Sequence, residues 1–88
     1  MEKKFVDVIF DRRKNYPKKG FGFIEVRVYL GRNTRKYFNM GNSTPDKWEV
    51  DAHSSEIKAL IKRCEEILSV MSFLKEELSL ENFDKHFY

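Results

Sequence analysis

The sequence predicts an α+β fold in which a three-stranded antiparallel β-sheet is packed on one face by a long C-terminal α-helix. Three segments in the first half of the chain alternate apolar and polar residues, as strands buried on one face do. The second half carries one apolar stripe with steps of three and four residues, which is typical of an amphipathic helix. The length of 88 residues allows one domain with one core, so we interpret residues 1–88 as a single unit.

The predicted strands cover residues 3–11, 22–30 and 34–40. The middle strand alternates most clearly, because Ile24, Val26 and Val28 share one face while charged and aromatic residues share the other. A basic loop, defined as residues 12–20, joins the first two strands. Residues 31–33 form a short hairpin connection, because glycine and asparagine tolerate the positive φ that such turns require. The three segments therefore predict a meander with one apolar face.

The predicted long helix covers residues 54–78, and a short second helix covers residues 80–87. Asp51, Ser54 and Ser55 are candidate N-caps of the first helix, and Ser79 of the second. The apolar stripe consists of Ile57, Leu60, Ile61, Cys64, Ile67, Leu68, Met71, Leu74 and Leu78. At ~1.5 Å per residue the long helix would measure roughly 35 Å, which exceeds the length of the strands. We therefore expect its far end to overhang the sheet or to bend near Ser69 and Ser72.

The single tryptophan, Trp48, lies at the junction between the predicted sheet and the predicted helix, just after Gly41, Pro45 and Asp46. These turn-forming residues let the chain leave the last strand and start the helix. A large ring at this point can close the open end of the space between the two elements. We therefore expect Trp48 to pack in the core rather than to stack on a nucleic-acid base.

Charge is unevenly distributed along the chain. Residues 1–50 carry a charge of +6 and residues 51–88 a charge of −3, which together give the net charge of +3. A basic half beside an acidic half suggests that one part of the fold contacts a polyanion. A basic half also occurs in proteins that have no nucleic-acid partner.

Several classes of protein are disfavoured. No apolar run approaches the ~18 residues of a membrane span, and the N-terminus has no signal-peptide core, so we expect a cytoplasmic protein without a membrane partner. The lone Cys64 excludes an internal disulfide. His53 and His86 are too far apart in sequence for a zinc motif, and no phosphate-binding glycine loop is present. We expect no metal, no cofactor, no small-molecule substrate and no catalytic activity.

The stretch "YPKKGFGFIEVRVYLGRNTRKYFNMG…TPDKW" resembles the N-terminal arm-type DNA-binding domain of tyrosine-recombinase integrases from phages and mobile elements. The matching positions are Gly20 or Gly22, Ile24, Arg27, Gly31-Arg32, Phe38, Met40-Gly41 and Pro45 to Trp48. Two positions, Met40 and Asn42, depart from the usual pattern of the family.

The resemblance implies a function in DNA recombination. It implies that the three-stranded sheet lies in the major groove of DNA and anchors a recombinase at arm sites beside the crossover region. It also implies a separate catalytic domain in a longer parent integrase, so the chain is expected to be a non-catalytic fragment. Tyr88 is then simply the last residue of the chain and not the recombinase nucleophile.

The polar face of the predicted sheet carries the candidate base contacts: Arg27, Tyr29, Arg35, Tyr37, Asn39 and Glu25. Arginine can donate two hydrogen bonds to guanine, asparagine can pair with adenine, and tyrosine can bond phosphate or pack against thymine methyl groups. Glu25 can accept from cytosine, or can neutralise Arg27 or Arg35 across the sheet. The alternative for this face is a solvated surface with cross-strand ion pairs and no ligand.

The candidate phosphate contacts are Arg12, Arg13, Lys14, Lys18, Lys19, Arg32 and Lys36. Contacts to phosphate set affinity without sequence preference. The alternative for each of these side chains is an ordinary solvated surface cation.

Two alternatives belong to other functional classes. Domains that bind double-stranded RNA also combine a sheet with helices, but this chain has no predicted helix before its first strand. A protein-interaction module is the second alternative. The end of the chain carries Phe73, Phe83, Phe87 and Tyr88, which can dock a partner or the remaining domains of a parent integrase.

Overall fold

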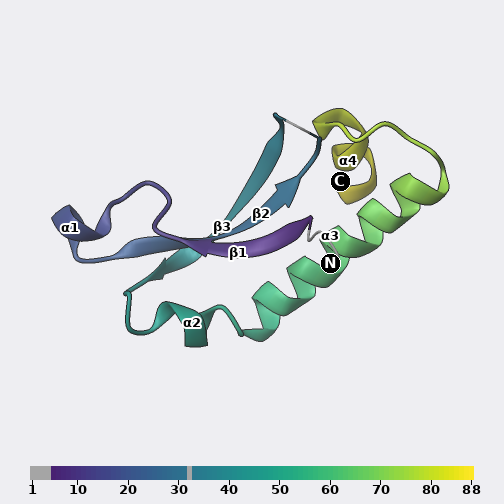
Figure 1. Cartoon of the computed structure of the whole chain (residues 1–88). Helices are drawn as coiled ribbons and strands as arrows, with labels where there is room; N and C mark the ends of the chain where they lie inside the picture. The colour runs from purple at the N-terminus through teal and green to yellow at the C-terminus, as the bar shows by residue number, and fades with distance from the viewer. Residues whose placement is uncertain (1–4, 32) are drawn as a thin grey trace, which may run out of the picture.

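The computed structural model describes residues 5–31 and 33–88, so residues 3 and 4 of the first predicted strand, and Arg32, lie outside the described residues. Three strands, β1 (Val6–Phe10), β2 (Gly22–Tyr29) and β3 (Arg35–Ser43), form an antiparallel sheet in the order β1-β2-β3. The helices in the described residues are α1 (Tyr16–Lys19), α2 (Trp48–Asp51), α3 (Ser55–Phe73) and α4 (Leu80–Phe87). In Figure 1, α3 runs along one side of the sheet, and α4 turns back beside the end of the sheet that lies opposite α1. The predicted α+β fold is confirmed.

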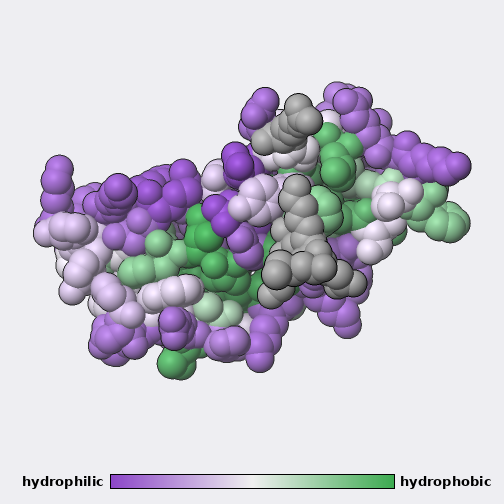
Figure 2. All heavy atoms as spheres, in the orientation of Figure 1, coloured by the Kyte–Doolittle hydropathy of each residue, from purple (hydrophilic) through white to green (hydrophobic). Residues whose placement is uncertain are grey.

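The core lies between the sheet and the helices α3 and α4. Its buried apolar members are Val6, Ile24, Val26, Val28, Leu30, Ile57, Cys64, Ile67, Met71 and Phe83. The strand residues of this set are those that the alternation predicted, because Ile24, Val26 and Val28 share one face of β2. Val6 lies opposite Val28 in register, on the same face. Figure 2 shows apolar side chains gathered in the middle of the molecule and hydrophilic ones around the end that carries α1.

A β-bulge in β3 differs from the regular strand that the residue pattern predicts. The register of β2 and β3 shifts between Phe23 and Glu25, where two residues of β3 face one residue of β2. Gly41 lies in this bulge with a φ of 111°, a conformation that side chains disfavour. Pairing resumes beyond the bulge and the strand continues to Ser43, whereas the predicted strand ends at Met40.

Trp48 closes one end of the core, as predicted. Its ring stacks on Phe10 with a centroid separation of 5.6 Å and an interplanar angle of 6°. The ring packs against the buried cluster while staying partly accessible. Trp48 also begins the short helix α2, which is held to the sheet by a 2.5 Å hydrogen bond from Ser43 Oγ to Asp51 Oδ2.

The helix α3 ends at Phe73, so the predicted boundary at residue 78 is wrong. The helix begins as predicted, with Ser54 Oγ accepting from the backbone N–H of Ile57 at 3.3 Å. At the other end Lys75 adopts a left-handed φ of 57° and donates its N–H to the carbonyl of Ser72. This is the Schellman termination, formed here without the usual glycine. The helix is therefore cut short rather than bent.

The short helix α4 is confirmed and belongs to the core. Ser79 Oγ accepts from the N–H of Asn82 at 3.1 Å and caps the helix as predicted. Phe83 is fully buried, and Phe87 packs on Phe38 with a centroid separation of 5.0 Å. None of the helices in the described residues combines the length and the apolar content that crossing a bilayer requires.

Candidate nucleic-acid interface

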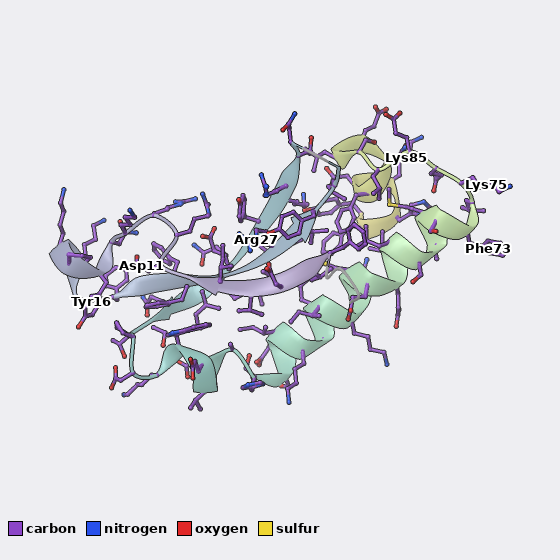
Figure 3. The ribbon with its side chains drawn as sticks, in the orientation of Figure 1. Asp11, Tyr16, Arg27, Phe73, Lys75 and Lys85 are labelled. Atoms are coloured by element: carbon purple, nitrogen blue, oxygen red, sulfur yellow. The ribbon has the colours of Figure 1, made fainter. Side chains whose placement is uncertain are left out.

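The face of the sheet that points away from α3 is polar, and we call it the open face. It consists of Asp7, Ile9, Glu25, Arg27, Tyr29, Arg35, Tyr37 and Asn39. These residues share one face because they alternate with the buried residues of each strand and pair with one another in register. Arg27, labelled in Figure 3, rises from the sheet on the side opposite α3.

The open face contains three rows of cross-strand neighbours, and two of them carry arginine and tyrosine. Asp7, Arg27 and Tyr37 form one row, because Arg27 pairs with Asp7 on β1 and with Tyr37 on β3. Tyr29 lies opposite Arg35 in the next row. In each of these two rows an arginine therefore lies beside a tyrosine across β2 and β3.

Arg27 is paired with Asp7 by two hydrogen bonds. Its Nε donates to Oδ1 at 3.0 Å and its Nη2 donates to Oδ2 at 2.7 Å. The guanidinium carbon also lies 4.9 Å from the centroid of the Tyr29 ring. The hydrogen bonds to Asp7 raise the pKa of Arg27 above its usual value. Asp7 was not among the predicted site residues, although its place on the polar face follows from the alternation of the first strand.

Glu25 is paired with Arg12, and not with Arg27 or Arg35, which were the alternative to a base contact in the sequence analysis. Arg12 donates from Nε to Oε1 and from Nη2 to Oε2, each at 3.1 Å. Its guanidinium carbon lies 3.8 Å from the centroid of the Tyr37 ring, and its pKa is raised chiefly by the hydrogen bonds to Glu25. Glu25 is only 2% exposed beneath this cover. A cytosine can therefore reach the carboxylate only if Arg12 moves away.

Arg35 is the exposed cation of the open face. Its guanidinium carbon lies 5.1 Å from the Tyr29 ring centroid, and it makes no ion pair with any residue in the described part of the chain. Asn39 is also exposed, and its Oδ1 accepts the N–H of Gly41 at 2.8 Å. The amide N–H₂ group of Asn39 donates to no residue within the ranges 5–31 and 33–88.

The basic loop places its cations at one edge of the open face. The carboxylate of Asp11 accepts the backbone N–H of Asn15 at 2.7 Å and that of Tyr16 at 3.3 Å, which fixes the entry into α1. The helix ends at Gly20, whose φ of 77° suits glycine. Arg12, Arg13, Lys14, Lys18 and Lys19 are all exposed there. The sequence pattern predicted these cations but not the short helix that carries two of them.

Two predicted phosphate contacts, Arg32 and Lys36, do not belong to the basic loop in sequence. Arg32 is outside the described residues. Lys36 lies on the covered face of the sheet, with Nζ 3.0 Å from Asp84 Oδ1 on α4 and 5.3 Å from the Tyr88 ring centroid. The contact between Lys36 and Asp84 is an ion pair. Burial lowers the pKa of Lys36, but the interaction with Asp84 outweighs it and the pKa is raised.

The set predicted for protein contact is divided by the structure. Phe83 and Phe87 belong to the core or pack against it, which corrects their prediction as a docking surface. Phe73 and Tyr88 stay exposed, at 85% and 82%. Phe73 lies at the far end of α3, away from the sheet (Figure 3).

Neither histidine belongs to a cluster of metal-ligating residues within residues 5–31 and 33–88. His86 Nε2 lies 2.6 Å from Glu76 Oε1, and this contact ties α4 to the segment before it. His53 is exposed after α2.

Comparisons with protein-family models, with curated proteins and with solved structures give no match for this chain.

Proposed function

We propose that the chain is a non-catalytic domain that binds double-stranded DNA through its open face, which enters the major groove. The observation that carries the proposal is the division of the sheet into two faces. The described helices α3 and α4 pack on one face, and the other presents Arg27, Arg35 and two tyrosine rings. The major groove, about 12 Å wide, accepts a β-ribbon of this kind.

The distribution of charge on the proposed surface supports separate roles for its residues, phosphate binding for some and base recognition for others. Arg12 and Arg27 are each matched by a carboxylate, so these pairs add little net charge. Net attraction to phosphate then comes from Arg35 and from the exposed cations of the basic loop. In this proposal the loop sets affinity, and the strands read bases.

The likeness of the sequence to integrase arm-type domains supports a more specific role. We propose that the domain anchors a tyrosine recombinase at arm sites, with the remaining domains of the parent integrase as its protein partner. This role adds nothing to the binding chemistry, which rests on the open face and on the cations of the basic loop.

The proposed interface predicts that Arg35→Ala weakens binding to a preferred duplex by about 1–3 kcal/mol and relaxes preference at one base pair. Lys18→Ala should instead weaken all duplexes alike, because a phosphate contact carries no sequence information. Fluorescence anisotropy with duplexes selected from a randomised library measures both affinities.

The proposed phosphate contacts also predict a dependence on salt. For the parent, the logarithm of affinity should fall with the logarithm of salt concentration, with a slope of about −0.9 per phosphate neutralised. The same anisotropy titration, repeated at several salt concentrations, measures this slope.

Lys58→Ala is the matched control, because Lys58 is exposed on α3 and its loss changes the net charge equally. We expect this variant to bind as the parent does. Equal affinities for parent, Arg35→Ala and Lys58→Ala would contradict the proposed face. An RNA duplex of the same sequence is the competitor, and preference for RNA would favour the double-stranded RNA alternative.

A second candidate function is protein binding by the exposed end of α3. Val70, Phe73 and Leu74 are 44%, 85% and 54% exposed, and they lie close together at helical spacing. A domain that binds no duplex at low salt but self-associates, and loses this association on Phe73→Ser, would support this candidate instead.

A further inference from the structure

Arg12 and Arg27 are held by their carboxylate partners in the same geometry. In each pair the carboxylate accepts from Nε and from Nη2, so it occupies the side edge of the guanidinium. The other edge is formed by Nη1 and by the second N–H of Nη2. Nη1 of neither arginine hydrogen-bonds to a residue within the described ranges.

The orientation of Arg27 is restrained on two sides. Asp7 holds the side edge of its guanidinium, and the Tyr29 ring lies 4.9 Å from its central carbon. The side chain is nevertheless 25% exposed and starts from the middle strand of the open face. An arginine held in this way loses little further rotamer freedom when it forms a second bidentate contact.

The geometry points to Asp7 as a positioning residue that aims the free edge of Arg27 at a guanine in the major groove. Two parallel N–H groups match guanine O6 and N7, which is the commonest specific arginine–base contact. Glu25 holds Arg12 in the same manner and is a second positioning residue rather than a base contact. This inference rests on the proposed DNA-binding function.

The inference separates specificity from affinity. A carboxylate close to DNA repels phosphate, so Asp7 opposes general binding while it supports recognition of one base. Removing the charge of Asp7 should therefore lower the preference for guanine while it leaves equal or raises the affinity for duplex DNA of any sequence. If Asp7 only stabilised the fold, its substitution would lower the preference for guanine and the general affinity together.

The test is Asp7→Asn, which keeps the size of the side chain and removes its charge. Preferred duplexes are first selected with the parent protein from a randomised library, and each guanine is then replaced in turn. For the parent, one replacement should weaken binding by about 5- to 150-fold, the range of a bidentate base contact. In Asp7→Asn that penalty should fall at least fivefold, while affinity for random duplex stays equal or rises.

Glu66→Gln provides the matched control, because it removes the same charge from an exposed position of α3. It should leave the guanine penalty unchanged. Arg27→Lys tests the same base contact from the side of the arginine. Lysine keeps the charge but lacks the bidentate edge, so the guanine penalty should fall in this variant as well. Adding Asp7→Asn to Arg27→Lys should then change the penalty no further.

The possible results distinguish the inference from the function on which it rests. If the parent binds no duplex, the proposed function and the inference both fail. If the parent binds and prefers guanine, but Asp7→Asn retains the full penalty, the inference alone is overturned. An amide NMR spectrum of each variant verifies the fold. If Asp7→Asn is unfolded, the comparison of parent with Arg27→Lys decides, and an unchanged penalty there overturns the inference.

Discussion

Asp11 lies where β1 ends and the basic loop begins, and its side chain organises the first turn of that loop. Its backbone adopts a φ of 53°, and its carboxylate accepts two successive backbone N–H groups, from Asn15 and Tyr16. Gly22 permits this arrangement, because a Cβ atom at position 22 would lie 2.6 Å from the Cβ atom of Asp11. The residues that flank the loop, Asp11 and Gly22, therefore approach each other closely.

We predict that Gly22→Ala lowers the free energy of unfolding by about 1–3 kcal/mol, the usual cost of overpacking. The reason is that the new methyl group and the Asp11 side chain cannot occupy their places together. Chemical denaturation followed by the fluorescence of Trp48 measures the change. In an Asp11→Gly background, which lacks the opposing side chain, the same substitution should cost far less. An equal cost in both backgrounds would show that the clash is not the cause.

At the scale of an element, the end of α3 is decided by backbone conformation rather than by hydrophobic pattern. The apolar stripe continues to Leu74 and Leu78, but these residues are 54% and 38% exposed and lie beyond the helix. The termination depends on Lys75, whose φ of 57° lets the N–H of Glu76 reach the carbonyl of Met71 at 2.9 Å. The left-handed residue at a helix end is usually glycine or asparagine, so a lysine at position 75 did not mark the end and the pattern overestimated the helix.

The strained position predicts that Lys75→Gly stabilises the protein by about 1 kcal/mol, because glycine adopts positive φ without steric cost. For a domain of this size, that gain corresponds to a rise in melting temperature of roughly 4–8 °C. Thermal unfolding followed by circular dichroism measures it. Lys75→Ala removes the same side chain but keeps a Cβ atom, so it should give no such rise. Equal stabilisation by alanine would attribute the effect to the loss of lysine instead.

At the scale of the whole molecule, α4 completes the core that the sheet and α3 begin. Phe83 is fully buried, and Arg63 on α3 donates from Nη2 to the backbone carbonyl of Phe87 at 2.5 Å. Lys36 on the covered face of the sheet pairs with Asp84 from the same helix. The C-terminal segment is therefore part of the domain, and its contacts leave the open face free.

This arrangement predicts very different costs for two phenylalanine truncations. Phe83→Ala should lower the free energy of unfolding by about 3–5 kcal/mol, since it empties a buried site. Phe73→Ala should change it by no more than about 0.5 kcal/mol, because the side chain is 85% exposed. Urea titrations of the two variants provide the comparison. Similar costs would mean that α4 does not share the core of the sheet.

The faces of the strands could be predicted because strand alternation is a local property. Val26 and Arg27 point in opposite directions whatever the rest of the chain does, and the register confirms both assignments. The packing of Trp48 against the core was predictable for a similar reason, since turn residues and one large ring mark the junction.

The sequence by itself determined which side chains lie on the polar face of the sheet and which form the apolar stripe of the long helix, because each depends on a period of few residues. The tertiary structure decided that Glu25 pairs with Arg12, that Asp7 holds Arg27 and that Lys36 turns toward α4. Those pairings join residues far apart in the chain, so they depend on register, on the path of the basic loop and on the docking of α4. A pattern of a few neighbouring residues cannot predict contacts between residues that are far apart in the sequence.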